Sequence, residues 1–201
     1  MVAEYLRWIV GGFLAPQPTL RRLLSGGHGY DVAVQLFVLA FLIEAMSFTA
    51  FGIKAGTGSF IVVHLGNLVT STIAFALLTF LVLRLGRLAG GTGLLPEAVL
   101  AMAWYSLMSS LLSPLVVSLM ADLSQALRPA AANADEFVTP EISTSSLMAF
   151  VFAGITSIWL LANAVVAVHG FRNIWGVIGV IVGVPCILLF LATMLTGGAP
   201  R

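Results

Sequence analysis

The stretch at residues 32–52, VAVQLFVLAFLIEAMSFTAFG, decides the fold class of this chain. Nearly all of its residues are apolar, and a helix needs about 20 such residues to cross the roughly 30 Å of hydrocarbon in a bilayer. One carboxylate, Glu44, lies a little past the middle of the stretch. An ionised acid is costly at that depth, so Glu44 is either a working group or a residue kept for a structural reason.

The composition extends this interpretation to the whole chain. Hydrophobic residues make up 60% of the 201 residues, and charged residues only 8%. A soluble domain is about 45–50% apolar and about 25% charged, so we expect an integral membrane protein. The net charge of +1 and the scattered basic residues argue against nucleic acid as a partner. The single Cys186 excludes an internal disulfide framework and a CxxC metal site.

Five apolar stretches are long enough to span a membrane, at residues 32–52, 59–83, 97–120, 146–168 and 174–196. Open strands leave backbone groups unpaired in lipid, and no alternating pattern is present, so the stretches are predicted to be helices. The predicted fold is therefore an all-α polytopic membrane bundle with five transmembrane helices in one domain, residues 31–201.

The segment before the first span, residues 1–30, has an amphipathic rather than a spanning pattern. Trp8 and Phe13 can enter the membrane interface while neighbouring arginines face anionic headgroups. Thr19 is in position to cap a short interfacial helix. The alternative is a loosely ordered tail.

Lysines and arginines near the span ends predict the orientation, because cytoplasmic loops carry an excess of them. With a cytoplasmic N-terminus, that side collects Arg7, Arg21, Arg22, Arg84, Arg87 and Arg172. The other side collects Lys54, Arg128 and Arg201. We therefore expect a cytoplasmic N-terminus and an outside C-terminus, in a multi-pass protein of the bacterial cytoplasmic membrane. The six arginines form the candidate lipid-facing surface.

Three polar residues of the first two spans form a candidate intramembrane cluster. With a rise of 1.5 Å per helical residue, Glu44 and Asn67 each lie about 12 Å below the outer surface, and His64 lies one turn nearer to it. A carboxyl that hydrogen-bonds to Asn67 or His64 would clamp the two helices together. The other interpretation is a site that handles protons or a substrate.

Small residues on two other spans are candidates for helix packing, because small side chains let helix backbones approach closely. They are Ser106, Ser109 and Ser113 in the third span, and Gly176, Gly179 and Gly183 in the fifth.

The motifs of common active sites are absent. The sequence contains no HExxH, CxxC or GxSxG, and its glycine-rich KAGTGS lacks the GK[ST] ending whose lysine a P-loop places on phosphates. We therefore expect no enzymatic activity, no catalytic or metal-binding residues and no cofactor.

Three passages of the chain are distinctive: APQPTLRRLLSGG before the first span, LGRLAGGTGLLPEAVLAMAWYSLMSSLLSPL around the third, and VVAVHGFRNIWGVIGVIVGV across the last short loop. Together they resemble the Yip family of Ypt/Rab-interacting proteins, specifically its Yip-one domain. The resemblance implies five helices, a cytoplasmic N-terminus and no enzymatic activity. Eukaryotic relatives bind prenylated small GTPases, but their DLYGP-type and GYxxFAL-type motifs are absent here, which argues against GTPase binding.

Two functions follow as hypotheses. The first is a non-enzymatic membrane scaffold or organiser, whose partners are the lipid bilayer, other membrane proteins or further copies of the chain. The alternative is a small transporter or permease subunit that uses Glu44, His64 and Asn67 as an intramembrane coupling site.

Overall fold

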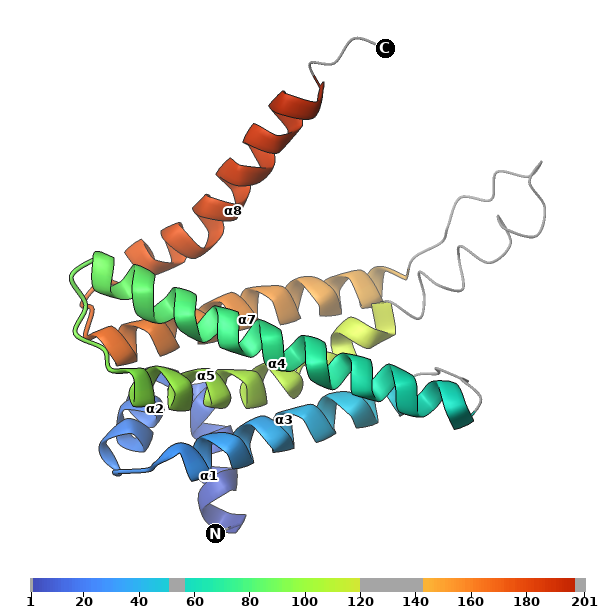
Figure 1. Ribbon diagram of the computed structural model, residues 1–201, viewed down its shortest axis with the longest axis horizontal. Helices are drawn as coiled ribbons and strands as arrows, with labels where there is room; N and C mark the ends of the chain where they lie inside the picture. Colours follow the sequence, from blue (N-terminus) through green and yellow to red (C-terminus); the bar gives the residue numbers. More distant parts are fainter. Residues whose placement is uncertain (1, 51–56, 120–142, 198–201) are drawn as a thin grey trace.

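The apolar stretches fold as helices in the residues that the computed structural model describes, which are 2–50, 57–119 and 143–197. Those ranges contain no strand, so the predicted all-α class is confirmed. Figure 1 shows the long helices lying together, the short N-terminal helices near one end of them, and the last helix leaving the bundle.

The N-terminal segment forms two short helices, α1 (Val2–Leu14) and α2 (Pro16–Ser25). Proline suits the first turn of α2 because the N–H that it lacks would have no helical partner there. Since α2 begins at Pro16, Thr19 lies inside the helix, and its predicted role as a cap is wrong. The buried Leu20 and Leu23 of α2 pack it against the bundle, while Arg21 and Arg22 are exposed.

The bundle consists of α3 (Tyr30–Ala50), α4 (Thr57–Leu88), α5 (Leu95–Ser110) and α7 (Thr144–His169), with a short helix at Ser113–Leu119. α5 is the central element, because it packs against α2, α3, α4 and α7. Its burial reflects this position: Trp104, Met102 and Met108 are among the largest fully buried side chains of the described chain.

Three described helical segments are long and apolar enough to cross a membrane by themselves: Tyr30–Ala50, Val62–Leu88 and Thr144–His169. A fourth span is formed if α5 and the short helix after it are taken together. The last helix, α8 (Ile174–Gly197), matches the predicted fifth span in length, but the structure describes its side chains without a gap only over Ile174–Ile187, which is too short to count as a span. The count of five therefore stays a prediction.

The third predicted span, residues 97–120, is not one straight helix. α5 ends at Ser110, and the helix Ser113–Leu119 continues at an angle of 49°. Pro114 accounts for the break, because it has no N–H to donate to the carbonyl of Ser110 and its ring clashes with the preceding turn. The bend places Ser113 at the corner, where its hydroxyl donates to Ser47 Oγ of α3 at 2.9 Å.

α8 packs chiefly against α7 and then diverges from the other helices (Figure 1). The three glycines predicted to pack in this span lie on its described part. A Cβ added at Gly179 or Gly183 would have no atom within 4 Å, and one at Gly176 would meet only Asn173 of the preceding turn. These glycines therefore do not bring α8 close to another described helix.

Candidate functional site

A cavity of about 350 Å³ lies where α3, α4 and α5 meet. Five aromatic side chains contribute to its wall: Phe37, Phe41, Phe48, Phe75 and Tyr105. Its polar groups are the carboxyl of Glu44, the hydroxyl of Tyr105 and the hydroxyls of five serines, Ser71, Ser106, Ser109, Ser110 and Ser113. The cavity thus combines an aromatic body with a short polar strip.

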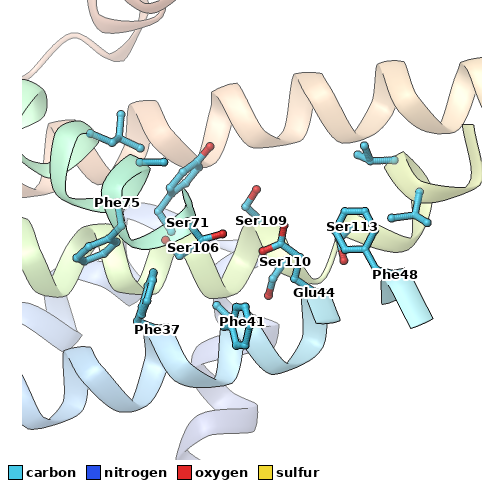
Figure 2. Close-up of a pocket in the computed structure, with 16 residues that line it drawn as sticks. Phe37, Phe41, Glu44, Phe48, Ser71, Phe75, Ser106, Ser109, Ser110 and Ser113 are labelled. Atoms are coloured by element: carbon cyan, nitrogen blue, oxygen red, sulfur yellow. The ribbon is translucent and has the colours of Figure 1, made fainter. Parts of the chain in front are cut away.

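The α3 helix places Glu44 in this strip. Figure 2 shows its carboxylate directed toward α5, near Ser109 and Ser110. Glu44 is partly buried, yet its carboxyl forms no hydrogen bond or ion pair with another residue in the described part of the chain. No other charged residue lines the cavity, so the carboxyl faces the space without a countercharge there.

The serines of the strip follow from the helical period of α5. Ser106, Ser109, Ser110 and Ser113 recur at spacings that keep them on one face, which is turned toward α3 and α4. The sequence predicted Ser106, Ser109 and Ser113 as packing residues, and the structure places all three in the cavity wall. Ser113 also contributes to packing, through its hydrogen bond to Ser47.

The protein already uses several of the hydroxyl hydrogens. Ser110 Oγ donates to the carbonyl of Leu107 at 2.8 Å. Ser113 Oγ donates to Ser47 Oγ, which in turn donates to the carbonyl of Ile43 at 2.9 Å. The oxygens of Ser110 and Ser113 consequently remain as acceptors. With Glu44 beside them, this part of the wall mainly accepts hydrogen bonds.

The structure does not assemble the predicted cluster of Glu44 with His64 and Asn67. Both α4 residues are half-buried, and neither lines the cavity, where α4 contributes Ser71 instead. Residues at equal depth in consecutive spans meet only where those spans are in close contact. α3 instead packs mainly against α5 and only slightly against α4, so the neighbours of Glu44 are the α5 serines.

His169, at the last residue of α7, occupies a second polar contact that sequence reasoning missed. Its ring is buried, with Nε2 3.0 Å from the carbonyl oxygen of Val82 in α4. The backbone N–H of Gly93 donates to Nδ1 at 3.3 Å. Because Nδ1 accepts, the proton of the neutral ring belongs on Nε2, which donates to Val82.

Glycines in the last turn of α4 and in the α4–α5 loop make room for this ring. A Cβ at Gly86, Gly91 or Gly93 would collide with His169. The loop is also held by Arg87, whose guanidinium donates two hydrogen bonds to the carbonyl of Gly93, at 3.1 and 3.2 Å. The repeated glycines of LGRLAGGTG indicate that another group packs closely against this backbone. The sequence alone does not identify that group as the His169 side chain.

The six arginines of the predicted cytoplasmic surface are all exposed. They lie on α1, on α2, in the last two turns of α4 and in the α7–α8 turn. Figure 1 shows that α2, the end of α4 and the end of α7 share one end of the bundle. The structure therefore gathers most of these arginines at the end that also carries the His169 contact.

Comparison with protein-family models gave a match to the Yip1 domain over residues 10–195. Neither the characterised proteins nor the solved structures that were searched include a match to the chain.

Proposed function

Because the chain belongs to the Yip1 domain family, we propose that it is a non-enzymatic membrane protein that organises other membrane components through protein or lipid partners. The observation that carries this proposal is the arginine-bearing end of the bundle. There α2 exposes Arg21 and Arg22 while its buried leucines anchor it to α5 and α7. A basic surface fixed on a rigid bundle can hold a negatively charged partner in a defined position.

Anionic lipid headgroups fit this surface. Each Lys or Arg near an anionic membrane surface contributes about 1 kcal/mol of attraction. The exposed apolar residues Val10 and Phe13 of α1 lie on the same N-terminal segment and suit the interface between headgroups and acyl chains.

A lipid-retention experiment tests the proposal. The protein is purified in mild detergent, delipidated and titrated with phosphatidylglycerol, and bound lipid is counted by native mass spectrometry. The double variant Arg21→Gln with Arg22→Gln should bind more than tenfold more weakly, because two such charges contribute about 2 kcal/mol and 1.4 kcal/mol is a factor of ten. Asp31→Asn, which removes an exposed charge of the opposite sign, is the control and should not weaken binding. Unchanged affinity in the arginine variant would contradict a lipid-organising surface.

Affinity purification of the full chain in mild detergent tests whether the same surface binds a protein partner. A partner that is captured by the wild type and by Asp31→Asn, but not by the arginine variant, is bound through this end of the bundle. Capture that does not depend on the arginines would move the organising surface elsewhere.

We also propose that this end faces the cytoplasm. The chain has one cysteine, so replacing Cys186 with Ser leaves a background without thiols. In that background Ser25→Cys and Ser143→Cys add one exposed thiol each, at opposite ends of the bundle. In intact cells a membrane-impermeant maleimide should label Ser143→Cys and spare Ser25→Cys. The reverse labelling would invert the orientation.

A second candidate function, a small transporter or permease subunit, is favoured by one observation. The Glu44 carboxyl lines a cavity and is not sealed by hydrogen bonds to other described residues. A role in proton coupling requires a side chain that ionises. Glu44→Gln should then abolish complementation of a deletion strain at normal protein level. A normal phenotype with Gln, but damage with Glu44→Leu, would contradict the proton-relay role.

A further inference from the structure

We propose that the Glu44 cavity is a binding site for a small lipophilic amine, a ligand with a protonated amino head and an apolar, preferably aromatic, body. The proposal rests on the cavity itself and does not depend on the organising function or on transport. Three properties of the wall support it: its charge, its hydrogen-bonding character and its aromatic content.

The first property is charge. Glu44 is the single charged residue among those that line the cavity. A carboxylate removed from bulk water is strongly disfavoured unless a positive group or hydrogen-bond donors accompany it. The described chain supplies neither to Glu44. A ligand that carries an ammonium group would supply both, since that group has a positive charge and several N–H donors.

The second property is the direction of the hydrogen bonds. Ser110 and Ser113 direct their hydrogens to protein acceptors, which leaves their oxygens facing the cavity as acceptors. The Glu44 carboxylate is also an acceptor only. A ligand head with several donors therefore complements Glu44, Ser110 and Ser113, whereas the negative charge of Glu44 would repel a carboxylate or phosphate head.

The third property is the aromatic wall. The rings of Phe37 and Phe75 lie 4.8 Å apart between their centroids, and Phe41 and Phe48 lie on the Glu44 helix, one on either side of the acid. An aromatic face attracts a cation within about 6 Å of its centre, and aromatic walls also favour an apolar ligand body. One wall thus serves both parts of an amphiphilic cation.

The volume sets the size of the ligand. A cavity of about 350 Å³ lies near the lower end of the about 300–1,000 Å³ typical of small-molecule sites. It suits a compact ligand with a single ring and a short chain.

A head-group series provides the test. Purified full-length protein in detergent is titrated calorimetrically with 4-phenylbutylamine, 4-phenylbutanol and 4-phenylbutyrate, which share a body and differ in charge. We expect saturable binding of the amine, at least tenfold weaker binding of the alcohol and no binding of the acid. An alcohol that binds as well as the amine would overturn the proposal, and so would folded wild-type protein that shows no saturable amine binding.

Two variants link the binding to the acid. Glu44→Gln keeps the shape of the side chain and removes its charge, so it should weaken amine binding at least tenfold and change alcohol binding by less than twofold. Asp31→Asn removes one negative charge from the same helix at an exposed position and should leave amine binding within twofold. Equal amine affinity in wild type and Glu44→Gln would place the binding elsewhere and overturn the proposal. Thermal melting shows whether Glu44→Gln is folded. If it is not, the titrations of the wild-type protein with the three ligands still test the proposal.

Discussion

The His169 contact and the Glu44 cavity are both places where one ionisable side chain lies between three segments of the chain, yet they are built in opposite ways. Around His169 the glycines leave no spare space, and both ring nitrogens have backbone partners. Around Glu44 a cavity remains, and the carboxyl has no described partner. A polar group that is fully satisfied and tightly enclosed stabilises a fold, whereas an unsatisfied one beside a cavity leaves its interactions to a ligand. His169 therefore has a structural role, in contrast to the binding role that we propose for Glu44.

The largest effect should come from removing the enclosed group. His169→Ala loses two hydrogen bonds and leaves a void beneath the α4–α5 loop, so the free energy of unfolding should fall by about 2–5 kcal/mol. Denaturation of the purified protein, followed by circular dichroism, measures this loss. A decrease below about 1 kcal/mol would show that the contact does not stabilise the fold. His169 would then not differ from Glu44 in its contribution to stability.

A smaller loss should follow from filling the space around the ring. Gly86→Ala places a methyl group against the His169 ring, which must shift at a cost of about 1–3 kcal/mol. Gly179→Ala is the matched control, since it is also a glycine within a helix but meets no atom within 4 Å. The control should gain about 0.5–1 kcal/mol, because alanine favours a helix interior over glycine. Equal effects of the two substitutions would mean that only helix propensity is measured.

The smallest effect on stability should come from Glu44. Glu44→Gln removes a charge that has no described partner, so stability should change by less than about 1 kcal/mol, toward greater stability. The same denaturation assay measures it in the absence of ligand. A large destabilisation would mean that the carboxyl has a structural partner, as a helix clamp would, and would make the two regions alike.

The membrane class and the helical fold followed from the sequence because they depend on apolar length and composition, which are local properties. The partner of Glu44 did not, because it depends on which helices touch. Depth along the membrane places Asn67 level with Glu44, but only packing shows that α3 lies against α5. His169 was missed for the same reason. Its partners, Val82 and Gly93, are more than 75 residues away in the chain.

The bend after α5 was only partly visible in the sequence. Pro114 marks the position, because proline breaks a helix at the preceding turn. The angle of 49° and the hydrogen bond from Ser113 to Ser47 depend on how the following segment packs, which no local pattern encodes. The sequence predicts helix packing for the serines of this segment, but whether they pack or line a cavity is decided by the neighbouring α3 and α4.

The central position of α5 constrains the order in which the chain is assembled during synthesis. Segments emerge from the ribosome in sequence, so α3 and α5 can associate before α7 exists. The chain cannot enclose the second side of α5, or seat His169 against the finished α4–α5 loop, until α7 has been made. α8 arrives last and packs chiefly on α7. Nascent chains that stop short of α7 would therefore expose the side of α5 that α7 covers to quality-control proteases, whereas chains that lack only α8 would already hold a closed core.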